Sequence, residues 1–436
     1  MSPDQTRLDT RLDRFIDNYA TRTRGMRVSA VRALFAVANR PEIVSLAGGM
    51  PNIKDLPLTY ISDHLAELIR TNGTQIMQYG SGQGELRMRE HMCEVMALEG
   101  IQAHPDDVVV TAGSQQGLDL VSRVFLDPGD VVLAESPSYV GALGTFLSYE
   151  AEVVHVDSDE QGLNPAALRE AVARLKQQGK RPKFCYTIPN YNNPSGLTQP
   201  WERRLEVIRT CHELGVLVIE DNPYGLLSLD ADPISAMRSV EPDVIYLGSF
   251  SKTFAPGFRI GWVLAPHALR EKLVLAQESA TLCPPVFSQF AISNYLETSD
   301  WRGQIDVYKD MYRERRDTML EALSDTMPKG STWTHPLGGF FVWVTLPEGI
   351  DSQAMLPRGV DARVAFVPGG AFYADGQGAR NVRLSYCFPT PENIRLGVER
   401  FADVVRGELE VLEIFGAQPT TRHPGQRNVV PGPDFV

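Results

Sequence analysis

Short apolar runs alternate with helical spacing along the first two thirds of the chain. Residues 107–113, DVVVTAG, form a β-branched run that ends in glycine, and apolar side chains then recur on one face of a predicted helix at Leu118, Val121, Val124 and Phe125. Further apolar runs, bounded by turn residues, are VVLAES (131–136), FCYTIP (184–189), VLVIED (216–221) and VIYLGSF (244–250). This alternation predicts an α/β fold with a mostly parallel sheet flanked by helices on both faces.

The pattern changes after about Trp301. A long polar-rich helix is predicted first, followed by the strand candidates FFVWVTL (340–346), RVAFVPG (363–369) and NVRLSYC (381–387). A closing helix has its apolar face at Ile394, Val398, Phe401 and Val405. We therefore expect an N-terminal segment (1–50), a large domain (51–300), a smaller α+β domain (301–415) and a flexible tail rich in proline and glycine (416–436).

Composition narrows the classes of function. The 436 residues include 42 basic and 54 acidic ones, so the net charge is −12, which argues against binding to nucleic acid or to an anionic membrane. Apolar residues make up 43% of the chain, enough for a large core, but no apolar run reaches membrane-spanning length. The N-terminus has no apolar signal-peptide segment, and the five cysteines have neither metal-site nor redox spacing. These features predict a cytoplasmic protein with reduced thiols and no bound metal.

Chemically useful side chains follow the predicted strands. Because the carboxyl ends of parallel strands meet at one edge of a sheet, these side chains should lie together. Ser114 and Gln115 open the helix after the first run, where free N–H groups can hold a phosphate. Three further runs lead to Tyr139, to Asn193 on a tight turn, and to Asp221 and Tyr224.

The last run leads into GSFSKTFAPGFRIGW (248–262), which gathers one lysine, several hydroxyl groups and one arginine. Lys252 can condense with an aldehyde, while Ser249, Ser251 and Arg259 can hold a phosphate. Asp221 can pair with a protonated ring nitrogen. Pyridoxal 5′-phosphate demands this combination of groups.

The motif SFSKTFAPGFRIGW (249–262), with NNPSG (192–196) and EDNPYG (220–225) at characteristic distances before it, resembles that of the fold-type I, pyridoxal-phosphate-dependent aminotransferases of class I/II. The resemblance extends from about Val28 to Val411. The run IVSLAGGMPNIKDLP (43–57) is similar to the subgroup of 2-aminoadipate and kynurenine aminotransferases.

The resemblance implies a role for each of these residues. Lys252 would be the Schiff-base lysine, Asp221 the partner of the pyridinium nitrogen, and Tyr139 the residue stacked on the ring. Asn193 and Tyr224 would bind the ring hydroxyl, and Tyr224 counts with Lys252 and Asp221 as catalytic. The phosphate would be held by Ser114, Gln115, Ser249, Ser251 and Arg259.

The resemblance also implies how substrate and partner subunit bind. Arg383, with Asn193, would bind the α-carboxylate of an amino acid, and the Gly49 backbone would line the substrate pocket. Tyr79 would reach the phosphate of a partner subunit, which predicts a homodimer with composite active sites. The N-terminal segment would cover the active site. Tyr191, close to Asn193, is expected to narrow the pocket or to touch the substrate.

Three functions follow from these patterns, and the leading one is an aminotransferase that acts on an amino acid and a 2-oxo acid. The alternative is a specialised biosynthetic enzyme that uses the same cofactor for β/γ-substitution or C–C bond formation on an amino acid such as S-adenosylmethionine. The cofactor residues do not distinguish the two. A non-enzymatic transcription factor is disfavoured, because the roughly 45 residues before LAGG show no helix-turn-helix pattern.

Overall fold

The computed structural model describes residue 13 and residues 15–25 and 40–416. The predicted N-terminal cover therefore lies largely outside the described residues, and so does the predicted tail after residue 416. The described part of the leading segment forms two 3-10 helices, η1 (Ile16–Asn18) and η2 (Thr21–Gly25).

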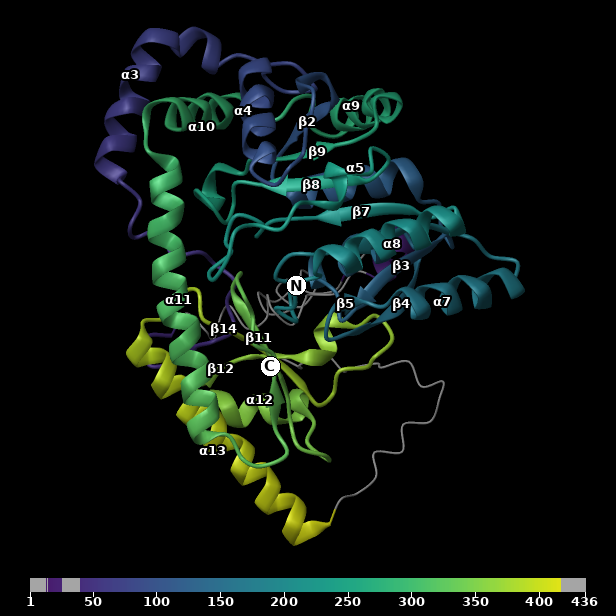
Figure 1. Cartoon of the computed structure of the whole chain (residues 1–436), viewed down its shortest axis with the longest axis vertical. Coiled ribbons are helices and arrows are strands. Elements are labelled where there is room, and N and C mark those ends of the chain that lie inside the picture. The colour runs from purple at the N-terminus through teal and green to yellow at the C-terminus, as the bar shows by residue number, and fades with distance from the viewer. Residues whose placement is uncertain (1–12, 14, 26–39, 417–436) are drawn as a thin grey trace, which may run out of the picture.

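The centre of the fold is an eight-stranded sheet in the order β2-β9-β8-β7-β6-β3-β4-β5 (Figure 1). Its strands are β2 (Val108–Thr111), β3 (Val131–Ser136), β4 (Glu152–Asp159), β5 (Gly162–Leu163), β6 (Pro182–Thr187), β7 (Leu217–Asp221), β8 (Ile245–Ser249) and β9 (Gly261–Leu264). Strands β8, β7, β6, β3 and β4 pair in parallel, whereas β9 and β5 run antiparallel to their neighbours. The mostly parallel sheet expected from the sequence is confirmed.

Helices cover both faces of this sheet, because its central strands bury side chains in both directions. Val218 belongs to the apolar cluster with α7 (Pro165–Gln177) and α8 (Trp201–Leu214). Its neighbour Ile219 belongs to the cluster on the other face. That second cluster is formed with α5 (Ser114–Phe125), α6 (Val140–Ser148) and α9 (His267–Thr281). Strands buried on both faces read as continuous apolar runs, as the sequence shows.

A smaller antiparallel sheet lies in the lower part of Figure 1. It has the order β10-β11-β14-β13 and consists of β10 (Thr332–Trp333), β11 (Phe341–Thr345), β13 (Val367–Pro368) and β14 (Asn381–Ser385). The run RVAFVPG, predicted as one strand, is divided between two sheets. Its first half, β12 (Val364–Ala365), pairs with β1 (Val44–Ser45), and its second half is β13.

The remaining helices frame the two sheets. Helices α3 (Leu58–Ile76) and α4 (Leu86–Ala97) both pack against α10 (Val286–Thr298) at one end of the molecule (Figure 1). The long α11 (Trp301–Thr326) packs against α13 (Pro391–Phe415), and α12 (Ser352–Asp361) contacts α13 as well (Figure 1). Short 3-10 helices are η3 (Pro105–Asp107), η4 (Met237–Ser239), η5 (Pro256–Phe258) and η6 (Gly369–Phe372). The domain boundaries near residues 50, 300 and 415 stay a prediction.

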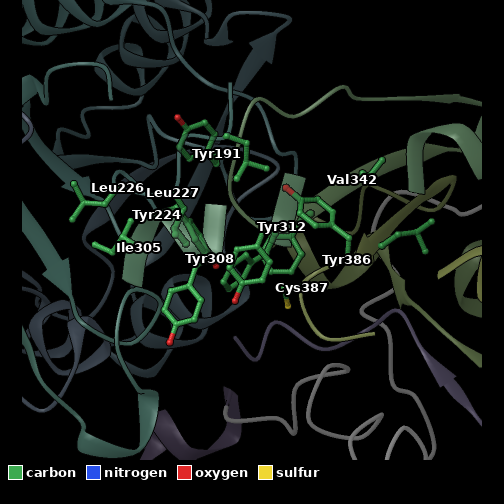
Figure 2. Packing of buried hydrophobic residues seen from close by; sticks show 14 of the residues in the cluster. Tyr191, Tyr224, Leu226, Leu227, Ile305, Tyr308, Tyr312, Val342, Tyr386 and Cys387 are labelled. Carbon is green, nitrogen blue, oxygen red and sulfur yellow. The ribbon is translucent and has the colours of Figure 1, made fainter. Parts of the chain in front are cut away.

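The largest apolar cluster joins the two sheets (Figure 2). Its members come from the loop after β7, from α11, from β11 and from the residues after β14. Those drawn in Figure 2 include Tyr224, Leu226, Leu227, Ile305, Tyr308, Tyr312, Val342, Tyr386 and Cys387. Within the described residues, we find no helix with the length and apolar character needed to span a membrane.

Candidate functional site

A cavity of about 390 Å³ opens where the parallel strands of the large sheet end. All predicted site residues except Tyr79 and Tyr191 line it. They are Gly49, Ser114, Gln115, Tyr139, Asn193, Asp221, Tyr224, Ser249, Ser251, Lys252, Arg259 and Arg383. The structure thus brings together residues from the large sheet, from the smaller sheet and from the N-terminal part of the chain.

Lys252 follows β8 and points its amine into this cavity. Its Nζ donates a hydrogen bond to the backbone oxygen of Gly49 at 2.8 Å and lies 5.6 Å from the centre of the Phe340 ring. Burial, with a smaller contribution from the nearby cations Arg383 and Arg259, lowers the pKa of Lys252 to about 8. An amine with such a pKa is partly uncharged near neutral pH and can act as a nucleophile.

Asp221 ends β7 and is buried, with 2% of its surface exposed. Its Oδ2 accepts a hydrogen bond from the Tyr186 hydroxyl at 2.7 Å, whereas its Oδ1 has no hydrogen-bond partner among the described residues. Burial raises the pKa of Asp221 to about 6, and the bond from Tyr186 opposes this shift. A buried carboxylate oxygen without a donor is costly, so this atom fits a protonated nitrogen of a ligand.

The start of helix α5 provides a cradle for an anion. Ser114 is the first residue of α5, and Gly113 before it has a φ of 81°, a conformation that favours glycine. A Cβ atom at Gly113 would lie 2.5 Å from Nη2 of Arg259. The Ser249 hydroxyl accepts a hydrogen bond from the Ser251 amide at 3.0 Å. Free amides of a helix start, one guanidinium and hydroxyl groups together suit a phosphate.

Arg383 lies on β14 at the opposite wall and is 3% exposed. Its Nη1 donates to Asn193 Oδ1 at 2.8 Å and its Nη2 to the backbone oxygen of Ala47 at 2.7 Å. The guanidinium carbon lies 4.2 Å from the ring centre of Phe341 and 5.0 Å from that of Phe372. Burial lowers the pKa of Arg383 to about 10, so the group stays a cation. Its Nε finds no acceptor in the described structure, which suits a carboxylate ligand.

Two tyrosines complete the walls of the cavity. The Tyr139 hydroxyl donates to Gln115 Oε1 at 3.3 Å, and burial raises the pKa of Tyr139. Tyr224 is 3% exposed and packs edge-on against Phe340, with ring centres 5.3 Å apart. Both hydroxyls therefore stay protonated and can donate hydrogen bonds to a ligand.

Two predicted residues lie elsewhere. Tyr79 lies outside the cavity with 76% of its surface exposed. Tyr191 does not line the cavity, so the expectation that it narrows the pocket is wrong. It is buried, and a Cβ at Gly338 or Gly339 would lie 2.5–2.6 Å from its side chain. It packs against the segment at Gly338 and Gly339, just before β11, within the largest apolar cluster (Figure 2).

Sequence reasoning missed several residues at this site. The cavity is also lined by Met50, Val140, Gly141, Ile188, Pro223, Pro256 and Phe341. Tyr186 and Phe372 do not line the cavity but contact residues that do, Asp221 and Arg383. A signal existed for Tyr186, which lies on a predicted strand, but the pairing of β6 with β7 is needed to connect it with Asp221. In the described ranges, no group of three or more His, Cys, Asp or Glu side chains could hold a metal ion.

Fold and cavity together define a fold-type I enzyme that depends on pyridoxal phosphate. The sequence model for aminotransferase class I and II matches residues 50–401, and the chain belongs to this family. It is 39% identical over 396 residues to an aromatic-amino-acid aminotransferase 1 of Thermococcus litoralis, covering 90% of this chain and 95% of the relative. It is 35% identical to a 2-aminoadipate transaminase of Thermus thermophilus, covering 89% of this chain and 96% of the relative.

A solved structure gives the same picture. The kynurenine aminotransferase of Pyrococcus horikoshii, solved in complex with PMP, superimposes with a TM-score of 0.86 at 39% identity, covering 90% of this chain and 97% of that one. The protein is therefore a pyridoxal-phosphate-dependent aminotransferase, and it transfers an amino group from an amino acid to a 2-oxo acid. The alternative of a substitution or C–C bond-forming enzyme is not favoured.

Proposed function

We propose that the cavity holds pyridoxal phosphate between Lys252, Asp221 and the start of α5. One observation carries this proposal. One cavity holds a lysine with a lowered pKa together with a carboxylate oxygen and a guanidinium nitrogen that have no hydrogen-bond partner among the described residues. When bound, the cofactor supplies an aldehyde for amino groups and a ring that withdraws electrons from the carbon beside them.

The residues of this chain would divide the remaining work. Ser114, Gln115, Ser249, Ser251 and Arg259 would hold the phosphate. Asn193 and Tyr224 would bind the ring hydroxyl, Tyr139 would lie on the ring, and the Oδ1 atom of Asp221 would keep the ring nitrogen protonated. The Nζ atom of Lys252 would take the proton from the substrate Cα and return it on the other side of the C–N bond.

For the substrate, we propose an α-amino acid with an aromatic or long apolar side chain. Arg383 would bind its α-carboxylate, next to the Gly49 backbone. Apolar side chains such as Met50, Ile188 and Phe341 form much of the remaining wall. The cations of the described wall are Lys252, Arg259 and Arg383, and each already has a proposed role. This favours the substrates named for the aromatic and kynurenine relatives over a second carboxylate such as that of 2-aminoadipate.

We further propose a cytoplasmic homodimer with composite sites. In support, seven large apolar side chains between residues 50 and 86 are exposed, and a partner subunit could cover them. They are Met50, Ile53, Leu58, Ile69, Met77, Tyr79 and Leu86. Tyr79 belongs to this set, and it would reach the phosphate site of the partner subunit.

Reduction with borohydride tests the role of Lys252. The reduced protein should carry the cofactor on Lys252 in a peptide map, because among the described lysines only Lys252 lines the cavity, and its pKa is lowered. Lys252→Ala should retain cofactor through the phosphate contacts but lose turnover by several orders of magnitude. Lys272→Ala on α9 is the matched control. Label on any other lysine, or normal turnover in Lys252→Ala, contradicts the assignment.

The substrate class is tested in the half-reaction without a 2-oxo acid. The protein is mixed with phenylalanine, tyrosine, kynurenine, glutamate or 2-aminoadipate, and release of the matching 2-oxo acid is followed together with the cofactor absorbance. We expect the aromatic amino acids to react with the larger kcat/KM. A larger kcat/KM for the acidic amino acids contradicts the proposed substrate class and leaves the cofactor assignment untouched.

A further inference from the structure

A tyrosine outside the cavity wall holds the carboxylate that faces the cavity. Tyr186 lies on β6, the strand that pairs in parallel with β7, and it is fully buried. Its hydroxyl donates to Asp221 Oδ2 at 2.7 Å. One carboxylate oxygen of Asp221 is thereby occupied, and the other, Oδ1, has no partner among the described residues.

The Tyr186 ring is fixed by its packing. Phe146 on α6 meets it edge-on, with ring centres 5.5 Å apart and an interplanar angle of 75°. Both rings are fully buried in the cluster on this face of the sheet. A ring held in this way keeps its hydroxyl in one position, so the hydrogen bond also fixes the plane of the Asp221 carboxylate.

The electrostatic surroundings make Tyr186 a permanent donor. Burial, and then the charge of Asp221, raise the pKa of the Tyr186 hydroxyl well above its ordinary value, so it keeps its proton. The other ionisable groups near this pair are Tyr139 and Tyr224, whose pKa values are also raised, and Glu135 on β3. Among the described residues, Tyr186 is the group whose hydrogen bond lowers the pKa of Asp221.

We propose that Tyr186 is a positioning residue of the transamination reaction, which holds Asp221 ionised and turned so that Oδ1 meets the ring nitrogen of the cofactor. This inference rests on the proposed role of Asp221 and adds a residue that does not itself touch the cofactor. If Tyr186 only stabilised the sheet, its loss would affect the binding of every cofactor analogue equally. If Tyr186 positions Asp221, its loss weakens the binding only of cofactors whose ring carries a nitrogen.

That difference defines the experiment. Apoprotein is reconstituted with pyridoxal phosphate or with its 1-deaza analogue, in which carbon replaces the ring nitrogen, and both dissociation constants are measured. In Tyr186→Phe, the affinity for pyridoxal phosphate should fall about tenfold, the effect of one charge-assisted hydrogen bond. The affinity for the deaza analogue should stay unchanged. An equal loss for both cofactors, or no loss for either, overturns the proposal.

Tyr246→Phe is the matched control, because Tyr246 is an equally buried tyrosine on β8 that donates to Glu99 Oε2 at 3.0 Å. It should leave the ratio of the two dissociation constants unchanged. If the wild-type protein itself does not distinguish the two cofactors, the proposed role of Asp221 fails. If the wild type distinguishes them and Tyr186→Phe does so equally, only the inference about Tyr186 fails.

A spectroscopic readout is independent of affinity. With cofactor labelled by ¹⁵N in the ring, the nitrogen chemical shift reports protonation, and in Tyr186→Phe it should move toward the unprotonated value. Should Tyr186→Phe fail to fold, 3-fluorotyrosine incorporated at position 186 keeps the ring shape and makes the hydroxyl a stronger donor. The stronger donor should lower the pKa of Asp221 in the apoprotein and, with cofactor bound, keep the shared proton on the ring nitrogen at neutral pH. A pKa of Asp221 that does not fall in the fluorinated protein, or a nitrogen shift toward the unprotonated value, contradicts the proposal.

Discussion

At the scale of single residues, Arg383 is held more tightly than a surface arginine. The rings of Phe341 and Phe372 lie close to its guanidinium, and two of its nitrogens donate to Asn193 and Ala47. A planar, forked group suits this slot, and the round ammonium of lysine does not. The slot therefore discriminates between two side chains of the same charge.

We predict that Arg383→Lys lowers kcat/KM for phenylalanine by about ten- to a hundredfold, the range for losing hydrogen bonds to a charged group. Phenethylamine, which lacks the carboxylate, should react with both proteins at equal rates. Arg395→Lys, on the exposed surface of α13, serves as control. An equal loss for the amino acid and the amine would mean that Arg383 acts on the fold and not on the carboxylate.

A pH-dependent stability follows from Asp221. Its pKa of about 6 in the folded apoprotein lies above the ordinary value of 3.8, so the folded state binds this proton more tightly than the unfolded chain does. The apoprotein should therefore lose stability as the pH rises from about 4 through 6. Asp221→Asn removes this loss and should be more stable than wild-type apoprotein by about 3 kcal/mol at pH 8 and roughly half that at pH 5.

Urea unfolding of both apoproteins at the two pH values measures this difference. The exposed aspartate at position 232, changed in the same way, is the control. A stability gap between Asp221→Asn and the wild type that does not vary with pH contradicts the prediction.

At the scale of elements, strand β9 and helix α5 approach each other closely at Gly261. A Cβ atom there would lie 2.5 Å from the Ser114 nitrogen and 2.6 Å from the Gly113 carbonyl carbon, both backbone atoms. Since backbone cannot move aside as a side chain can, any larger residue must displace the start of α5. The proposed phosphate cradle thus depends on a glycine one strand away.

Gly261→Ala should lower the free energy of unfolding by about 1–3 kcal/mol, the usual effect of overpacking. It should also weaken the binding of pyridoxal phosphate, because the helix start moves. Gly144→Ala on α6 is the control, since a Cβ there meets nothing within 4 Å and alanine favours the helix. Urea unfolding and reconstitution should show a loss of both stability and affinity in Gly261→Ala, whereas Gly144→Ala should keep its affinity and hold or gain stability.

The elements also show what a sequence can reveal. The strands that lead to Ser114, Asp221 and Lys252 were predictable, because apolar runs buried on both faces end abruptly at polar residues. Strand β4 was missed because much of it is only partly buried, so its apolar run is interrupted. The split of RVAFVPG between two sheets depends on the partners β1 and β14, which lie far away in the sequence.

Distance along the sequence also limited the prediction of the site. Residues within one motif could be assigned to the site together, whereas contacts between residues of different motifs could not be predicted. That Tyr186 donates to Asp221, or that Phe372 lies against Arg383, follows from strand order and from the position of η6. Tyr191 shows the converse, because closeness in sequence to Asn193 did not bring it to the cavity.

At the scale of the whole molecule, the proposed composite sites allow a test by mixing. Lys252→Ala should be inactive, and Tyr79→Phe should retain cofactor poorly. In a hybrid dimer of the two, one site would combine the intact Lys252 of one subunit with the intact Tyr79 of the other. Mixing should therefore restore cofactor retention and turnover at that site. No restoration, although sedimentation shows that hybrid dimers have formed, contradicts the role of Tyr79, and a fully active monomer contradicts the dimer.

The hydrogen bond between Arg383 and Asn193 crosses from the smaller sheet to the large one. If Arg383 also binds the substrate carboxylate, substrate binding and the contact between the two sheets are thermodynamically coupled. Thermodynamic linkage is reciprocal. A change that stabilises the contact between the sheets therefore raises substrate affinity, and bound substrate stabilises that contact by the same free energy. Slower amide hydrogen exchange in β14, measured with an unreactive carboxylate analogue bound, would then report the part of the binding free energy that stabilises this contact, away from the reacting atoms. Substitutions at Tyr191 and at its neighbours in this contact would change KM, although these side chains do not touch the substrate.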